Sequence, residues 1–263
     1  MILNMPRQVN DNIGENSTIL AVRQALIVGY MLGILWIRRY PTSITFSAAQ
    51  PFSLLFVVFV IGGGQNIPFA VAGGLIVALV GFGLSLGADH AYYKIEFKLQ
   101  DIFVASPVSS FTYLTGLAFS LLLFGLPSLV VLSALVMFLS ASILNILLLL
   151  ATILLLWGLM SLIGFSVASR MPHTRNVEQL TTFLHILVAV LPPVFYPVDI
   201  LPFEELRYVA YAVPTTHASL ILQHVMGVQT PADWSIWIGL AVLSGYFVAF
   251  GLLARAKAVW REV

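Results

Sequence analysis

The chain has 263 residues, of which 60% are hydrophobic and 9% are charged, and its formal net charge is +1. A mean hydropathy of +0.99 and a charged fraction far below the roughly 25% of soluble domains predict an integral membrane protein. Cysteine is absent, which excludes disulfides, thiolate metal sites and cysteine nucleophiles, and the near-zero net charge gives no reason to expect nucleic acid as a partner.

The long apolar stretches lack the period-2 alternation of barrel strands, so an all-α fold is expected. Residues 1–17 are polar and are expected to form a cytoplasmic tail rather than a signal peptide. In residues 18–40 the uninterrupted apolar run is only 13 residues long, with Arg23 before it and Arg38 and Arg39 after it. This pattern predicts an amphipathic helix lying in the membrane interface, and the alternative is a true span with the N-terminus outside.

Six further apolar runs predict membrane-spanning helices, over residues 47–61, 67–86, 111–132, 143–168, 177–190 and 233–254. Between the second and third runs, residues 88–107 form the longest polar stretch in the middle of the chain. There Ile95, Leu99 and Ile102 are spaced to share one face of a helix, which predicts a short amphipathic helix at the cytoplasmic side.

The stretch 191–227 contains five prolines and is too broken to span a bilayer, yet it is too apolar for an ordinary solvated loop. It predicts a re-entrant pair of short helices. Pro202 would open the first helix, and Thr215 or Thr216 would cap the second. Gly227 would end the second helix.

The charges predict the orientation of the chain. With six spans and the N-terminus inside, every Lys and Arg except Arg207 faces the cytoplasm. Both termini, including a basic tail over residues 256–263, would then be cytoplasmic, and residues 191–227 would lie outside the cell membrane.

The run that includes Pro193, Tyr196, Pro197 and Leu201-Pro202, followed by Pro214-Thr215, resembles the signature before the last span of type-2 ABC exporter permeases. The order of elements over residues 18–255 resembles that family too. The chain departs from the family where Val213 replaces a frequent Asn. It also departs in the segment 88–107, where His90-Ala91-Tyr92-Tyr93-Lys94 stands in place of a Glu-Arg-Gly-Thr-like run.

The resemblance implies six spans with an N-terminal interface helix (18–40), a cytoplasmic coupling helix (88–107) and an extracellular re-entrant helical hairpin (191–227). It also implies the permease subunit of an ATP-driven exporter, working as a homodimer or heterodimer of permeases with two ATP-binding cassette subunits. No Gly is followed by Lys, so the chain lacks a phosphate-binding loop, and ATP and Mg are expected on the partner. No catalytic residue, metal or cofactor is expected in the chain itself.

The candidate functional residues fall into four groups. Arg23, Arg38 and Arg39 are expected to hold the interface helix. The docking contacts for the partner would be Tyr92, Lys94, Glu96, Lys98, Leu99, Asp101 and Phe103. The extracellular gate would be formed by Pro193, Tyr196, Pro197, Pro202 and Pro214. The family implies that spans two and five line the substrate path, which gives Phe82, Leu86, Leu184 and Val188. The nearly uncharged spans favour a hydrophobic, amphipathic or lipid-linked substrate, and membrane lipid is a further expected partner.

Two other function classes are alternatives. A secondary, ion-coupled transporter needs carboxylates inside the membrane, and none lies in the interior of a predicted span, because Glu178 and Asp233 stand at the very start of the runs 177–190 and 233–254. A membrane-embedded enzyme needs convergent acidic or histidine side chains. His217 and His224 share a helix face but suggest no third ligand, so interface histidines are favoured over a metal site. His185 is either a functional group or a helix–helix hydrogen-bond partner.

Overall fold

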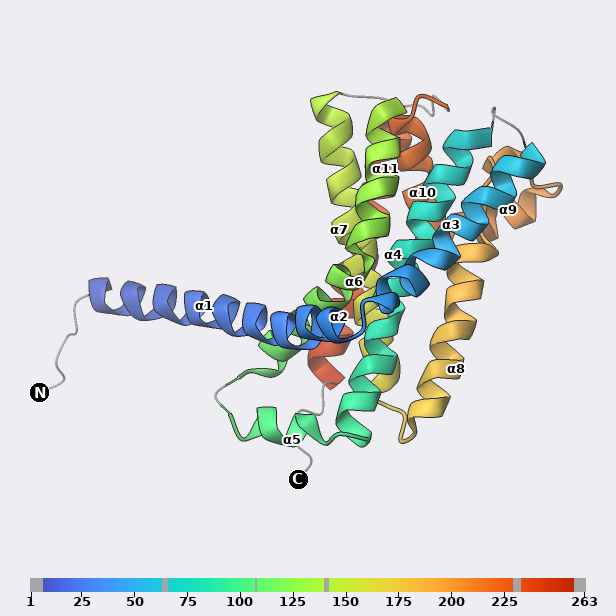
Figure 1. Ribbon diagram of the computed structural model, residues 1–263. Coiled ribbons are helices and arrows are strands. Elements are labelled where there is room, and N and C mark those ends of the chain that lie inside the picture. The colour runs from blue at the N-terminus through green and yellow to red at the C-terminus, as the bar shows by residue number, and fades with distance from the viewer. Residues whose placement is uncertain (1–6, 63–65, 107, 140–141, 229–232, 258–263) are drawn as a thin grey trace, which may run out of the picture.

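The computed structural model describes residues 7–62, 66–106, 108–139, 142–228 and 233–257, and within these ranges all regular structure is helical (Figure 1). This confirms the all-α prediction. In chain order the elements are α1 (Arg7–Gly29), the π-helical turn η1 (Tyr30–Ile34), α2 (Leu35–Arg39), α3 (Thr42–Gly62), α4 (Ile67–Ile95), α5 (Leu99–Val104), α6 (Ser110–Leu139), α7 (Ile143–Ala168), α8 (Thr174–His185), the π-helical turn η3 (Ile186–Val190), the 3₁₀ turn η4 (Val198–Ile200), α9 (Glu204–Tyr211), α10 (Pro214–Val225) and α11 (Asp233–Lys257).

Five of the described helical stretches are long and apolar enough to cross a bilayer. They are Thr18–Arg39, Ile67–Ile95, Ser110–Leu139, Ile143–Ala168 and Trp234–Arg255. The chain is therefore a multi-pass membrane protein. The predicted spans over 47–61 and 177–190 correspond to a shorter apolar helix, Pro51–Gly62, and to α8 with η3, whose first turns are polar. The six-span layout thus stays a prediction.

Helix α4 lies at the centre of the fold and contacts α3, α6, α7, α8 and α10. Its side chains Leu75 and Leu79 are fully buried with Leu156 of α7 and Ile221 of α10. Lipid tails are as apolar as these side chains, so close packing rather than transfer out of water holds the helices together. At the crossing of α4 and α7, a Cβ on Gly87 would lie 2.3 Å from the carbonyl oxygen of Gly164, so only glycine allows this approach.

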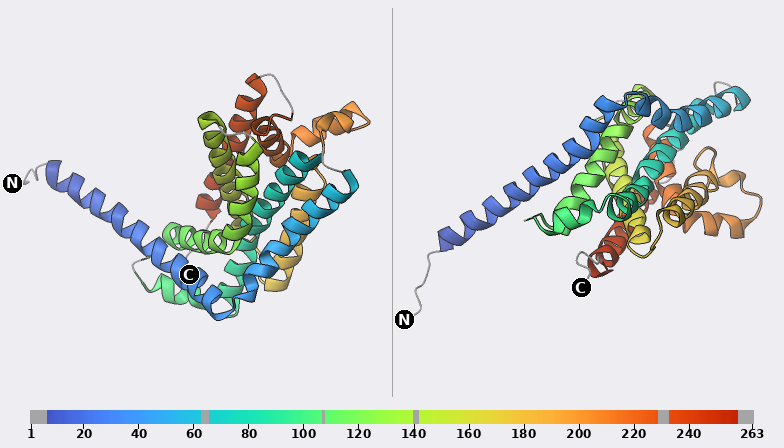
Figure 2. Two further views of the ribbon diagram at one scale, coloured as in Figure 1. Left: turned by 45° about the horizontal axis from the view of Figure 1, so that its top comes forward. Right: turned by 60° about the horizontal axis from the view of Figure 1, so that its bottom comes forward.

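Helix α1 leaves the bundle sideways, with its C-terminal half against α6 (Figures 1 and 2). The backbone of Ala25 and the side chain of Val28 approach Gly116 of α6 closely there. This direction agrees with an interfacial helix, while the length and hydropathy of Thr18–Arg39 also allow a span. Helix α1 begins at Arg7, so residues 7–17 are helical, and their cytoplasmic location stays a prediction. The ends 1–6 and 258–263 lie outside the described residues.

The two segments that the sequence singled out lie at opposite ends of the bundle (Figure 1). Helix α5, the loop between α7 and α8 and the C-terminal end of α11 share one end. Helices α9 and α10 lie towards the other end. The segments 88–107 and 191–227 thus lie apart in the bundle, and their placement on opposite sides of a membrane stays a prediction.

Candidate functional site

The chain after η3 is interrupted where two prolines follow each other. The carbonyl of Val188 would normally accept a hydrogen bond from residue 192 or 193, but Pro192 and Pro193 have no backbone N–H. The hydroxyl of Thr215, from the first turn of α10, donates to this carbonyl instead, with an O···O distance of 2.5 Å. A side chain 27 positions away in sequence thus completes the broken helix.

Helix α10 is buried along most of its length, between α4, α7 and α11. Two of its polar side chains make hydrogen bonds inside the fold. Ser219 Oγ donates to the Val194 carbonyl at 3.2 Å, and Gln223 Nε2 donates to Ser219 Oγ at 2.7 Å. Buried polar groups need such partners because an unsatisfied one is costly in a low-dielectric interior. Thr215, Ser219 and Gln223 are spaced four apart, so one polar stripe of the helix makes these bonds.

Two further hydrogen bonds hold the C-terminal end of α10 and the turn between α9 and α10. Asn145 Nδ2 of α7 donates to the Val225 carbonyl at 3.3 Å, and Tyr246 of α11 donates from its hydroxyl to the Ala212 carbonyl at 2.8 Å. Sequence reasoning missed Ser219, Gln223 and Tyr246. The four-residue spacing of Thr215, Ser219 and Gln223 is a signal that could have found two of them.

The caps of the hairpin helices differ in part from the prediction. Pro214 is the first residue of α10, but Val213 is its N-cap and neither Thr215 nor Thr216 caps the helix. Helix α9 begins at Glu204 with Phe203 as its N-cap, so the prediction that Pro202 opens the helix is wrong. The predicted end of α10 is confirmed, since Gly227 adopts a φ of 69°, in the left-handed region that favours glycine.

The predicted gate residues do not form one surface. Pro193 and Pro214 are buried, Tyr196 and Pro197 are half-buried, and Pro202 is exposed. Phe195, which was not predicted, lies against α4 at Gly73, where a Cβ would approach its ring to 2.2 Å. The prolines therefore shape the path of the chain, and their role as a gate stays a prediction.

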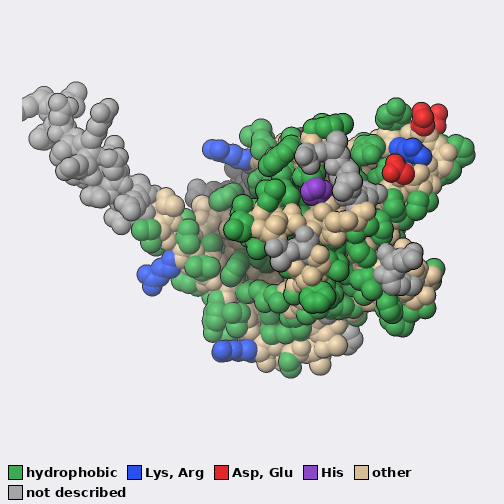
Figure 3. Space-filling view, turned by 90° about the horizontal axis from the view of Figure 1, so that it is seen from above, with side chains coloured by type: hydrophobic (Ala, Val, Ile, Leu, Met, Phe, Trp, Pro, Cys, Tyr) green, Lys and Arg blue, Asp and Glu red, His purple; other side chains and the backbone are tan. Residues whose placement is uncertain are grey.

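Helix α9 and the turn before it form an exposed lobe, which carries acidic and basic side chains among apolar ones (Figure 3). Arg207 donates from its guanidinium to the carbonyls of Asp199, at 2.9 Å, and Leu201, at 3.2 Å. Arg207 thereby ties η4 to α9. Tyr208 of α9 is 73% exposed.

The histidines do not converge on a metal. Among the described residues no group of three or more potential ligands is present. His217 donates from Nε2 to the carbonyl of Tyr211 at 2.8 Å. Burial lowers the pKa of His217 below its ordinary value of 6.5, and the bond to the carbonyl acts in the opposite direction. His185 lies beside Gly81 of α4, and its Nε2 is buried without a hydrogen-bond partner.

The segment 88–107 is two helical pieces rather than one helix. Helix α4 continues to Ile95, a turn follows, and α5 begins at Leu99. Lys98 has a φ of 51°, in the left-handed region, so the helical face predicted for Ile95, Leu99 and Ile102 is interrupted. The last turns of α4 carry His90, which is buried against Tyr113 and Phe165 at ring-centroid distances of 5.9 and 5.1 Å.

The predicted docking residues divide by exposure. Tyr92, Glu96 and Lys98 are exposed, Lys94, Leu99 and Phe103 are half-buried, and the side chain of Asp101 lies outside the described residues. The Phe103 ring contacts Tyr113 of α6 at 4.9 Å between centroids, so it holds α5 to the bundle. Phe97 and Ile102, which were not predicted, are 55% and 64% exposed.

The predicted substrate-path residues all contact the interior of this chain. Phe82 lies against Gly125 of α6, and Leu86 is only 2% exposed, in a cluster with Tyr113. Leu184 and Val188 are half-buried against the central core. None of the four is fully exposed, and a substrate path through them stays a prediction.

Comparison with known proteins identifies one family. The family model described as "ABC-2 type transporter" matches residues 14–227, from α1 to the glycine that follows α10. No curated protein matches the chain.

Proposed function

Because the chain belongs to the ABC-2 type transporter family, we propose that it is the permease subunit of an ATP-driven exporter. The family's membrane domain is a component of transport and is not itself catalytic. The observation that carries the proposal is the family match over most of the chain, together with a coupling segment and a hairpin at opposite ends of one helical bundle.

The proposed partner is an ATP-binding cassette subunit, present in two copies. It would dock on α5 and on the turn between α4 and α5, where Tyr92, Phe97 and Ile102 expose apolar surface beside Glu96 and Lys98. Thr174 of α8 donates to the carboxylate of Glu96 at 3.3 Å, so α8 would move with this turn. ATP and Mg would be bound by the partner, since the chain has no phosphate-binding loop.

The proposed substrate is hydrophobic, amphipathic or lipid-linked. No charged residue lies between Phe46 and Leu86 or between Ser106 and Ser169, so the route has little to offer a strongly charged solute. Two permease subunits, identical or different, would enclose the substrate path at their interface. Substrate would cross by alternating access, with the path open first to one side of the membrane and then to the other. Substrate would leave past α9 and α10 on the extracytoplasmic side.

The proposed orientation in the cell membrane follows from the charges, with both termini in the cytoplasm. The end of the bundle that carries α5 would be cytoplasmic, and the α9 lobe would face outside. Arg207 is then the single Lys or Arg of the sequence on the outer side.

Co-purification tests the proposal. The chain is co-expressed with an ATP-binding cassette subunit from the same genome, and the retained subunit and ATP hydrolysis are measured. We expect Phe97→Asp to abolish retention, because it places a charge in the docking surface. The matched control is Phe203→Asp, at a Phe that is 63% exposed on the other end of the bundle, and it should retain the subunit. If the unaltered chain binds no such subunit, the proposal is wrong.

One observation favours a second candidate, a proton-coupled transporter. Helix α4 extends through Asp89, so a half-buried carboxylate lies on a candidate span, which the sequence had not suggested. Export in vesicles separates the two. Under the main proposal export requires the ATP-binding subunit and survives Asp89→Asn, whereas a proton-coupled transporter would respond to the pH gradient and lose activity in that variant.

A further inference from the structure

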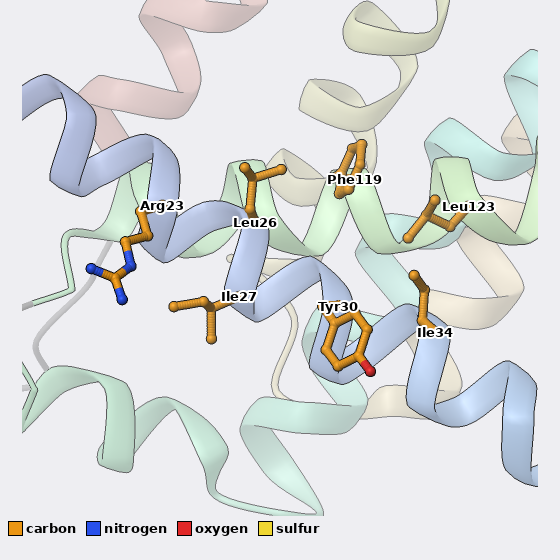
Figure 4. A pocket seen from close by; sticks show the side chains of 7 residues that line it. All are labelled: Arg23, Leu26, Ile27, Tyr30, Ile34, Phe119 and Leu123. Carbon is orange, nitrogen blue, oxygen red and sulfur yellow. The ribbon is translucent and has the colours of Figure 1, made fainter.

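A groove of about 380 Å³ lies where α1 and η1 cross α6. This volume is within the range of ligand pockets, which starts at roughly 300 Å³. Its lining residues come from the two crossing helices, as Figure 4 shows. They are Arg23, Leu26, Ile27, Tyr30, Ile34, Phe119 and Leu123.

The glycines of this crossing shape the groove. The Phe119 ring lies so close to Gly29 that a Cβ there would approach it to 2.6 Å, and Leu123 would meet a Cβ on Gly33 at 3.1 Å. Both side chains of α6 therefore press against α1 and η1. One π-helical turn, Tyr30–Ile34, forms the η1 side, and such turns often occur at functional sites.

The wall of the groove is apolar and open. Leu26, Ile27 and Tyr30 are 51%, 48% and 42% exposed, although each has α6 beside it. From Arg23 to Ile34 the helix rises about 16 Å at 1.5 Å per residue. An acyl chain that lies in the groove would therefore run along the axis of α1.

The charge at the groove selects the headgroup of its occupant. Arg23 lies at one end in Figure 4, with its stem along the apolar wall and its guanidinium directed outward. The sequence has no acidic residue between Glu15 and Asp89, so no nearby carboxylate along this segment neutralises Arg23. A guanidinium forms strong, often bidentate hydrogen bonds with phosphate.

We propose that this groove binds one anionic phospholipid, with an acyl chain along Ile27 and Tyr30 and the phosphate at Arg23. The lipid would fill the angle between α1 and α6 and hold α1 against the bundle. That it comes from the cytoplasmic leaflet rests on the proposed orientation, and the inner leaflet is the one that carries a negative surface potential.

Native mass spectrometry of the full chain in detergent tests this proposal, with phosphatidylglycerol and phosphatidylcholine of the same acyl chains as probes. We expect one phosphatidylglycerol to be retained in preference to phosphatidylcholine. Arg23→Gln should weaken phosphatidylglycerol binding about fivefold and bring it towards the level of phosphatidylcholine. Arg175→Gln is the matched control, because it removes the same charge at an exposed residue outside the groove, and it should change little.

A second variant tests the groove itself. Ile27→Trp should fill it and reduce retention of both lipids, with an unchanged melting temperature in lipid-free detergent as the sign of an intact fold. The proposal is overturned if Arg23→Gln and Arg175→Gln weaken binding equally, or if Ile27→Trp retains the lipid. It is also overturned if Ile27→Trp changes the oligomeric state, since a second copy of the chain would then cover this face. No ATP-binding subunit is needed, so the outcome is independent of the proposed function.

Discussion

The hydrogen bond from Thr215 to the Val188 carbonyl leads to a sharp stability prediction. Thr215 is fully buried, and Val has nearly the same shape as Thr without the hydroxyl. Thr215→Val should therefore leave the cavity filled but strip the Val188 carbonyl of its donor, since Pro192 and Pro193 supply none. An unsatisfied buried acceptor costs about 1–3 kcal/mol. At about 2–4 °C per kcal/mol for a chain of this size, the melting temperature should fall by roughly 2–12 °C.

Thr152→Val is the matched control. Thr152 is equally buried, and its hydroxyl donates at 2.8 Å to the Leu148 carbonyl, which already accepts the regular helical N–H bond of α7. The same substitution should therefore have little effect there. Thr215→Ser keeps the hydroxyl and should be milder than Thr215→Val. Thermal unfolding of the detergent-solubilised chain measures all three, and the reasoning fails if Thr215→Val is no more destabilising than Thr152→Val.

Three further predictions concern the α4–α7 crossing, the hairpin histidine and the orientation. Gly87→Ala should lower the melting temperature, because overpacking costs about 1–3 kcal/mol. Gly245→Ala is the control and should be neutral, since nothing lies within 4 Å of its added Cβ. Equal melting temperatures for the two variants would contradict the close approach of Gly87 to Gly164. The pKa of His217 is lower in the folded chain than in the unfolded chain, because the side chain is buried. As the pH falls below 6.5, the unfolded chain therefore binds the proton first, and the folded state loses stability that it had at higher pH. The melting temperature should thus drop more between pH 7.5 and 5.5 for the unaltered chain than for His217→Gln, and equal slopes would rule this out. In the cysteine-free chain, Glu205→Cys should react with an impermeant thiol reagent from outside and His173→Cys only from inside, and the reverse pattern would invert the proposed orientation.

Much of the fold follows from hydrophobic run length and local signals. The predicted span 143–168 is α7, Ile143–Ala168, because Ser142 is an N-cap that accepts a hydrogen bond from Asn145 N and the apolar run is unbroken. The two short helices of the hairpin were also predicted, since Pro214 and Gly227 start and end α10 with strong local preferences.

The errors arise where tertiary contacts override a local preference. Thr215 follows Pro214 and resembles a helix cap, but its hydroxyl donates to the carbonyl of Val188 instead. That carbonyl has no backbone donor, because Pro192 and Pro193 lack an N–H. Helix α4 was predicted to end at Leu86 because Asp89 and His90 are polar. It continues because His90 is enclosed by aromatic rings from α6 and α7, which no periodicity in the sequence reveals. The groove lined by Arg23 and Phe119 likewise could not be predicted, because it depends on where α1 crosses α6.

The length of α4 has a mechanical consequence. Its 29 residues form one uninterrupted rod of about 43 Å, longer than the hydrocarbon core of a bilayer. One end leads directly into the turn before α5, and near the other end Gly73 contacts Phe195 of the proline-rich stretch. The tight contact at Gly87 lies near the α5 end and can serve as a fulcrum. The part of α4 between Gly87 and Gly73 is longer than the part between Gly87 and the turn before α5. A small displacement at α5 would then move Gly73, and the Phe195 ring against it, farther than the turn itself.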